Sequence, residues 1–222
     1  MITPATFKFL RDLKKHNQRA WFHEHRERYL AARAEMVGLV EACLTEIAHF
    51  EPNILEQDPE DCLFRINRDT RFSKEKTPYK THFGAFITDR GRKMNRAGYY
   101  IHVEPGGCLL AGGLYMPPAP ELKAIRAAIL ADAAPLRRIL RQPAFVRQFG
   151  KEIPSDRLKT TPRDVPRDHP DADLLRYKSF GVWRNVPDRD VQSAAFVKEA
   201  ARSFRAMADF VHWLNAALDR KA

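Results

Sequence analysis

The sequence has no long hydrophobic run. No apolar stretch approaches the roughly 20 residues that a membrane-spanning helix needs, although 44% of the 222 residues are hydrophobic. The N-terminus starts like a helix and not with the basic, apolar and small-residue order of a secretion signal. We therefore expect a cytoplasmic protein that does not insert into membranes.

Cysteine is scarce, and nucleotide-binding glycine motifs are absent. Cys43, Cys62 and Cys108 stand at unrelated spacings without a Cys-x-x-Cys pair, which predicts reduced thiols, two or three of them buried. The sequence contains neither Gly-x-x-x-x-Gly-Lys nor Gly-x-Gly-x-x-Gly, so we predict no nucleotide cofactor. Low-complexity runs and internal repeats are also missing, and we predict a single packed domain over residues 1–222.

Acidic residues are few in the middle of the chain. Residues 61–100 hold ten Lys or Arg against four Asp or Glu, within a formal net charge of +10. A positive face of this kind attracts nucleic acid, acidic lipid headgroups or small anions, and charge alone does not choose among them. Solubility is the simplest role for such charge.

Hydrophobic periodicity predicts the first half of the fold. A helix begins at Thr3 and Pro4, an N-cap followed by proline, and ends near Asn17. A second, longer helix carries an inward stripe and stops before Pro52. The stripe consists of Trp21, Tyr29, Met36, Val40, Leu44 and Ile47. Period-two alternation then predicts strands at about 62–67, 82–88, 98–104 and 108–115. The short turn at residues 105–107 requires the last two strands to be antiparallel.

The second half returns to helical spacing. Residues 122–140 predict two helices and residues 145–149 a third short one. The irregular stretch 151–173 is long for a compact domain and is a candidate lid. Residues 174–183 predict one more strand, and residues 196–218 predict a closing amphipathic helix. The predicted fold class is α+β, with a mainly antiparallel sheet flanked by N-terminal and C-terminal helices.

The segment from Arg65 to Tyr79 packs five cations around Asp69. Arginine recognises carboxylate and phosphate groups bidentately, and Asp69 can hold Arg68 and Arg71 in a fixed fork. A lysine and a tyrosine hydroxyl in the same segment would complete an anion-binding shell. The predicted ligand-binding residues are Arg65, Arg68, Asp69, Arg71, Lys76 and Tyr79. The competing interpretation is a structural salt-bridge network that ties a strand to a loop.

The position of Arg68 tests the predicted strand. If residues 63–72 continue as a strand, Arg68 shares a face with the apolar Phe64 and Ile66, whereas Asp69 lies on the opposite face. A buried arginine without a partner costs several kcal/mol. Either the strand breaks near Asn67, or another acid or a ligand meets Arg68.

The same segment carries a family resemblance. Its pattern Arg-x-x-Arg-Asp-x-Arg-Phe-x-x-x-Lys-x-x-Tyr, which includes Phe72, resembles the signature of the domain of unknown function 2461 family, uncharacterised proteins found mostly in bacteria. The resemblance spans about residues 5–218, and Glu75 departs from the Asp or Asn that the family favours. Further matching blocks are Asn17, Arg19, Trp21, Phe22, Gly98 to Tyr100 with His102, Glu104 to Gly107, and Lys178 to Phe180. The resemblance implies no activity and no catalytic residues.

His82, His102 and Glu104 are the candidates for proton transfer. His102 and Glu104 lie two apart on a predicted strand, so their side chains share a face, and His82 comes from a neighbouring segment. Two histidines and a carboxylate could bind a metal. The sequence does not fix a third ligand, and we predict no metal site.

Two functions follow from these residues. The leading prediction is an anion-binding site for nucleic acid or a phosphorylated ligand. The alternative is an enzyme acting on a small phosphate- or carboxylate-bearing substrate, with His82, His102 or Glu104 as acid or base. The basic connection between Arg90 and Arg96 is either a solvated turn or a further set of phosphate contacts.

Overall fold

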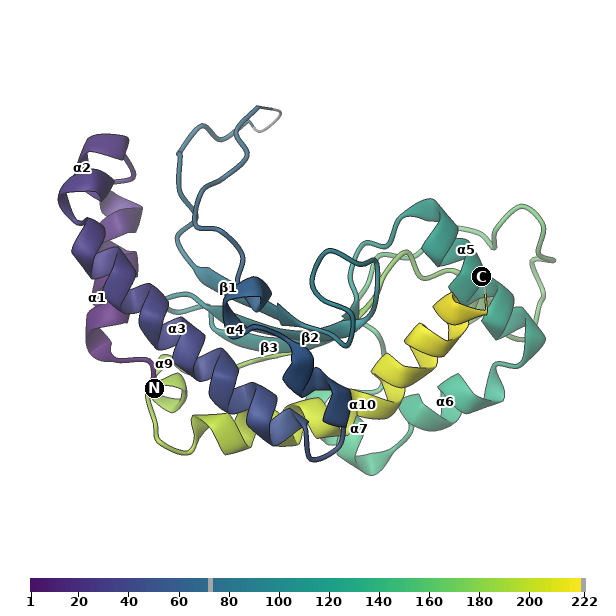
Figure 1. Cartoon of the computed structure of the whole chain (residues 1–222). Helices are drawn as coiled ribbons and strands as arrows, with labels where there is room; N and C mark the ends of the chain where they lie inside the picture. Colours follow the sequence, from purple (N-terminus) through teal and green to yellow (C-terminus); the bar gives the residue numbers. More distant parts are fainter. Residues whose placement is uncertain (72–73, 221–222) are drawn as a thin grey trace. The chain divides into compact units, whose positions relative to one another are not determined.

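The computed structural model describes residues 1–71 and 74–220 (Figure 1). The chain forms two compact units, each built from separate stretches of sequence. Unit 1 comprises Met1–Arg92, Tyr100–Leu110 and Asn185–Arg202, and unit 2 comprises Lys93–Tyr99, Ala111–Arg184 and Ser203–Ala222. The single domain predicted over residues 1–222 stays a prediction.

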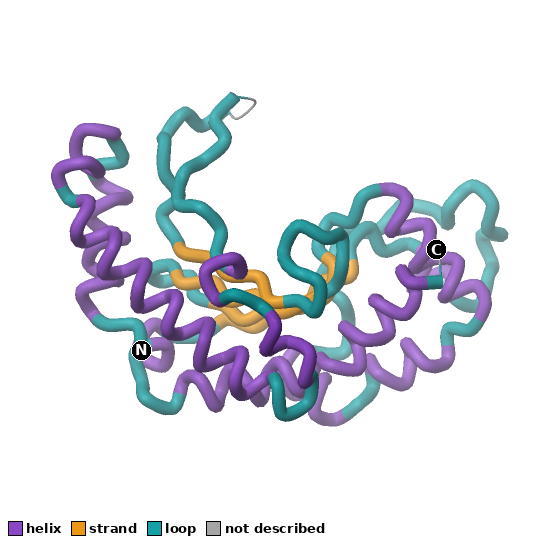
Figure 2. The backbone as a smooth tube through the Cα atoms, in the orientation of Figure 1, coloured by secondary structure: helices purple, strands orange, loops and turns teal. Residues whose placement is uncertain are grey.

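The described residues form one antiparallel sheet. Its strands, drawn in orange in Figure 2, follow the order β1-β2-β3-β4, so each strand neighbours the one that precedes it along the chain. Their bounds are β1 Phe83–Ile87, β2 Gly98–Val103, β3 Leu109–Leu114 and β4 Phe180–Asn185. With helices at both ends of the chain, the α+β class and the mainly antiparallel sheet are confirmed.

Unit 1 begins with three helices. They are α1 Pro4–Lys15, α2 Arg19–Glu24 and α3 Arg26–Ile47. Phe9 of α1 and Tyr29 of α3 both stack on Phe83 of β1, with ring centroids 6.5 and 6.3 Å apart, so apolar faces of both helices pack on the edge strand. The unit also contains the short elements η1 Pro52–Glu56, α4 Pro59–Cys62 and α9 Asp188–Val191.

The prediction of one continuous helix through residues 21–47 is wrong. The helix is interrupted at His25, whose backbone leaves helical geometry with φ −106° and ψ 23°. The His25 ring stacks on Trp21 at 4.2 Å, and its Nδ1 contacts the Trp21 carbonyl oxygen at 2.9 Å. These contacts between His25 and Trp21 accompany the bend, and helical geometry resumes at Arg26.

The predicted strand at 62–67 is also wrong. Helix α4 ends at Cys62, and only isolated antiparallel bridges follow, Leu63 with Ala85 and Asn67 with Tyr79. The Lys80 amide donates to the Ile66 carbonyl oxygen at 2.8 Å, so this stretch pairs with its own returning chain. The described residues 64–71 and 74–82 therefore form a protruding hairpin-like segment, here called the arm, which rises from β1 (Figure 1).

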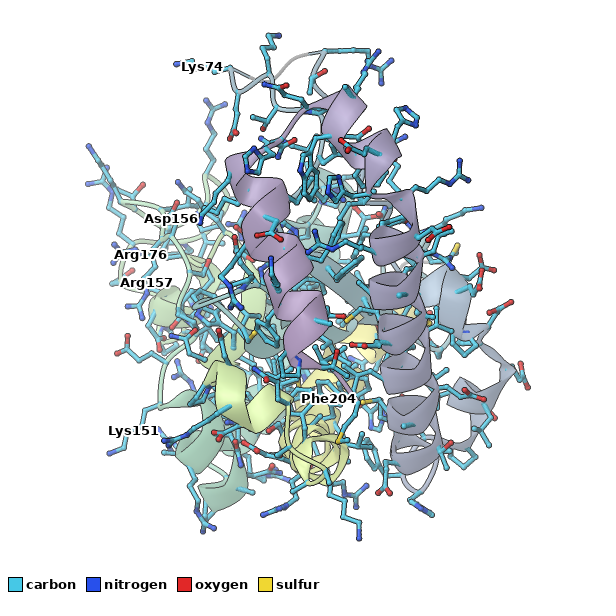
Figure 3. The ribbon with its side chains drawn as sticks, turned by 90° about the vertical axis from the view of Figure 1, so that its left-hand side faces the viewer. Lys74, Lys151, Asp156, Arg157, Arg176 and Phe204 are labelled. Carbon is cyan, nitrogen blue, oxygen red and sulfur yellow. The ribbon has the colours of Figure 1, made fainter. Side chains whose placement is uncertain are left out.

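Unit 2 is mostly helical. It contains α5 Ala119–Ala131, α6 Ala134–Leu140, α7 Pro143–Phe149 and α8 Ala172–Leu175, and α10 Phe196–Asp219 continues into it from unit 1. The fully buried Phe204 of α10, labelled in Figure 3, packs on Tyr99 of β2 at 5.1 Å. No described helix has both the length and the apolar character to cross a membrane.

The predicted strand at 174–183 starts later than expected. Leu174 and Leu175 belong to α8, and β4 begins only at Phe180. The stretch before β4 pairs with the start of the predicted lid, because the Leu158 amide donates to the Arg176 carbonyl oxygen at 2.8 Å. Figure 3 shows Asp156, Arg157 and Arg176 close together in this region. Opening of the rest of residues 151–173 stays a prediction.

Candidate functional site

The arm divides the predicted anion site into two parts. Its base holds Arg65, Arg68 and Lys80, together with Arg92 and the ring of Phe64; we call these five residues the arm base. The Lys80 Nζ lies 5.4 Å from the centre of the Phe64 ring, and the Arg92 Cζ lies 5.2 Å from it. Phe64 itself is 37% exposed. Two cations of the arm base thus lie over an accessible aromatic ring, and Arg65 and Arg68 are close enough to act electrostatically on one of them, Lys80.

Hydrogen bonds to backbone oxygens fix two of these cations. Lys80 Nζ donates to the Arg65 carbonyl oxygen at 2.8 Å, and Arg92 Nε donates to the Asp61 carbonyl oxygen at 2.8 Å. Neutral carbonyl groups position a cation without cancelling its charge, and both residues therefore keep their attraction for an anion.

Repulsion among the cations is visible at Lys80. Burial lowers the pKa of Lys80, and the charges of Arg65, Arg92 and Arg68 lower it further. Arg68 makes an ion pair with Glu75, at 3.0 Å between Nη1 and Oε2. The strand that the sequence predicted around Arg68 thus does not form, and Arg68 meets Glu75, an acid other than Asp69. The longer Glu75 side chain makes this contact at the position where the sequence departs from the expected Asp or Asn.

The described residues at the tip of the arm, 69–71 and 74–76, are exposed except for the half-buried Thr70. Asp69 accepts two hydrogen bonds from the Arg71 guanidinium, at 3.0 and 2.7 Å, and these bonds lower the pKa of Asp69 to about 2. Asp69 therefore pairs with Arg71 but not with Arg68, and the predicted fork forms only in part. Lys76 Nζ donates to the Thr70 carbonyl oxygen at 3.0 Å, and Lys74 projects outward near the tip (Figure 3). The signature residue Phe72 lies outside the described residues.

Tyr79 is a buried anchor of the arm. Its ring is 4% exposed and stacks on Phe22 of α2, with centroids 4.0 Å apart. The Asn17 amide donates to the Tyr79 carbonyl oxygen at 2.9 Å and accepts from the Tyr79 amide at 3.1 Å. Tyr79 therefore packs toward the N-terminal helices, and a role for its hydroxyl in ligand binding stays a prediction.

The structure brings His82, His102 and Glu104 together, so all three residues singled out in the sequence meet. The two imidazole rings lie 4.2 Å apart, and His102 Nε2 contacts Glu104 Oε2 at 3.2 Å. Tyr100 Oη contacts His102 Nδ1 at 2.9 Å, and Thr81 Oγ1 donates to Glu104 Oε1 at 2.9 Å. We call His82, His102 and Glu104 the histidine cluster.

The electrostatics of the histidine cluster follow from its burial. Burial lowers the pKa of His82 to about 4, and the charges of His102, Lys80 and Arg68 act in the same direction. Burial also raises the pKa of Tyr100 to about 12. His82 is therefore neutral at pH 7, and the cations of the arm base are close enough to influence it.

Sequence reasoning missed Lys80, which directly follows the signature, so local charge was the available signal. Arg92 belongs to the basic connection after β1, which the sequence offered as a possible further set of phosphate contacts. Arg96 from the same connection is 8% exposed and pairs with Asp219 at 2.6 Å. The solvated turn predicted there therefore does not include Arg96.

The comparisons with known proteins identify the family. A family model described as "Conserved hypothetical protein (DUF2461)" matches residues 5–213. The chain belongs to the DUF2461 family. Searches of the curated proteins and of the solved structures found no match. Because the DUF2461 description assigns no activity, a function has to be inferred from the arm base and the histidine cluster.

Proposed function

We propose that this DUF2461 protein binds a phosphate-bearing ligand at the arm base, and that the ligand is single-stranded nucleic acid. Two observations support the proposal: Lys80 and Arg92 lie over the Phe64 ring, and the charges of Arg65, Arg92 and Arg68 act on Lys80. Among the described residues, Glu75 is the one carboxylate that makes an ion pair with any of these four cations. Such an excess of positive charge favours an anionic ligand.

A bound phosphate would offset the repulsion within the arm base. The pKa of Lys80 is lowered by burial and by three arginines, so its ammonium group is less stable than in water. A phosphate between these cations would restore that stability through charge-assisted hydrogen bonds. Ligand binding should therefore raise the pKa of Lys80.

The aromatic ring distinguishes a nucleic acid from a bare phosphate. Phe64 is accessible, and the Arg92 guanidinium lies over its ring. Bases of single strands stack on aromatic rings and on guanidinium planes, whereas the bases of a duplex are already stacked on one another. Arg71, Lys74 and Lys76 at the exposed tip of the arm would contact further phosphates along the strand.

Binding of a fluorescent single-stranded oligonucleotide, compared with its duplex, tests the proposal. We expect Phe64→Ala and Arg65→Gln each to weaken single-strand binding fivefold or more. For Phe64 the reason is the loss of base stacking, which contributes about 1–3 kcal/mol per base. Arg11→Gln removes an exposed arginine from α1 and is the matched control, expected to leave the affinity unchanged. Equal affinities for all four proteins would refute the assignment.

An enzymatic function is the second candidate. The cations of the arm base influence the pKa of His82, so a bound anion would lie near imidazole and carboxylate groups. In this alternative the arginines hold a small phosphate- or carboxylate-bearing substrate while His82 of the histidine cluster transfers protons. Turnover of p-nitrophenyl phosphate that is lost in His82→Ala and kept in His23→Ala would support it. No turnover by the wild-type protein would count against a phosphate-ester substrate.

A further inference from the structure

We infer that His82, His102 and Glu104 form a binding site for a divalent transition-metal ion such as Zn²⁺. One ligand atom from each residue lies within 4.8 Å of the other two. Two imidazoles with one carboxylate are a donor set suited to such ions. The inference is independent of nucleic-acid binding, because it uses other side chains and has its own test.

The sheet supplies the third ligand that the sequence could not place. His102 lies on β2, and Glu104 follows the end of that strand on the same face. His82 directly precedes β1, the neighbour of β2, and its ring lies 4.2 Å from that of His102. Backbone pairing of β1 with β2 therefore sets the position of His82 relative to the other two groups.

Distances within the cluster suit a metal. With metal–nitrogen bonds of about 2.0–2.1 Å, two ligand atoms of a tetrahedral site are separated by roughly 3.3 Å. His102 Nε2 and Glu104 Oε2 already lie 3.2 Å apart. An ion that bridges these atoms would replace the hydrogen bond between them, and a side-chain rotation of His82 would complete the set.

The outer atoms of two proposed ligands already have partners. Tyr100 Oη contacts His102 Nδ1, which leaves His102 Nε2 facing Glu104. Thr81 Oγ1 holds Glu104 Oε1, which leaves Oε2 facing His102. Metal-bound histidines and carboxylates commonly have such second hydrogen bonds, which orient the ligand atom toward the ion.

The same contacts disfavour proton transfer by His102. Both of its ring nitrogens are engaged, one by Tyr100 and the other by Glu104, so neither is directed at a substrate. As a metal ligand, His102 needs only Nε2 and retains the contact of Nδ1. The side chains of His102 and Glu104 are 14% and 28% exposed, which leaves an entry path for an ion.

Metal titration of the untagged, chelator-treated protein tests the inference. We expect one equivalent of Co²⁺ to bind with the visible absorption bands of a nitrogen- and oxygen-ligated ion, and Zn²⁺ to displace it. His82→Ala and Glu104→Gln should each weaken binding at least 100-fold. His23→Ala, which removes an exposed histidine from α2, should bind as the wild type does.

Two further measurements separate a metal site from a merely structural cluster. Tyr100→Phe and Thr81→Ala should each weaken Co²⁺ binding by about 10–100-fold, because they release the outer atoms of the ligands. In the wild-type protein, Zn²⁺ should shift the ring ¹⁵N resonances of His82 and His102 but not those of His23. Absence of stoichiometric binding, unshifted His82 and His102 resonances, or full affinity in His82→Ala would overturn the inference.

Discussion

Replacement of Tyr79 separates its structural role from a role in ligand binding. The ring is 4% exposed and stacks on Phe22, so Tyr79→Ala removes a buried aromatic side chain. Large-to-small substitutions of this type cost about 3–5 kcal/mol. A free-energy loss of this size lowers Tm by roughly 6–20 °C, since each kcal/mol corresponds to about 2–4 °C in a chain of this length. Tyr79→Phe keeps the stacked ring and should cost less than about 1.5 kcal/mol.

Urea unfolding followed by far-UV circular dichroism measures both changes. Oligonucleotide binding by folded Tyr79→Phe then tests the hydroxyl separately, and we expect an affinity within twofold of wild type. If Tyr79→Ala were as stable as wild type while Tyr79→Phe lost binding, Tyr79 would act on the ligand, and the anchoring role argued from its burial would be refuted.

Two other predictions test packing and charge in the rest of the chain. Gly113→Ala should destabilise the protein by about 1–3 kcal/mol or more in urea unfolding. The reason is that φ of Gly113 is +105° and an added Cβ would collide with a carbonyl oxygen of β4. Gly38→Ala, in open space on α3, is the control and should not destabilise the protein. Hydrogen bonds from Lys8 and Arg28 lower the pKa of Asp12 from 3.8 to about 2. The stabilisation of the folded protein by these bonds is therefore complete above pH 4 and is lost as the pH falls toward 2. The urea midpoint of Asp12→Asn should therefore fall less over that pH range than that of wild type, and parallel curves would contradict this.

Local sequence signals predicted the fold best where the structure depends on neighbouring residues. The turn at residues 105–107 joins β2 to β3 as expected, and the apolar periodicity of residues 196–218 corresponds to α10. The strand at 62–67 failed because alternation cannot identify a pairing partner. Residues 66 and 68 hydrogen bond to residues 80 and 78 of the returning arm and do not continue into the sheet.

The candidate site was predictable in composition but not in pairing. Arg68 has an acid next to it in Asp69 and another seven residues away in Glu75, and only the turn of the arm selects Glu75. The approach of His82 to His102 likewise depends on the pairing of two strands separated by a long connection. Residue types therefore revealed which groups carry chemistry, whereas tertiary contacts decided which of them meet.

The most direct test of phosphate binding at the arm base is the salt dependence of single-strand affinity. Each phosphate contact contributes about −0.7 to the slope of log affinity against log salt concentration. We predict that Arg65→Gln makes the slope shallower by about 0.7, whereas Arg71→Gln changes it less, because Asp69 already pairs with Arg71. An unchanged slope in Arg65→Gln, with binding lost only in Arg71→Gln, would place the ligand at the arm tip and contradict the account.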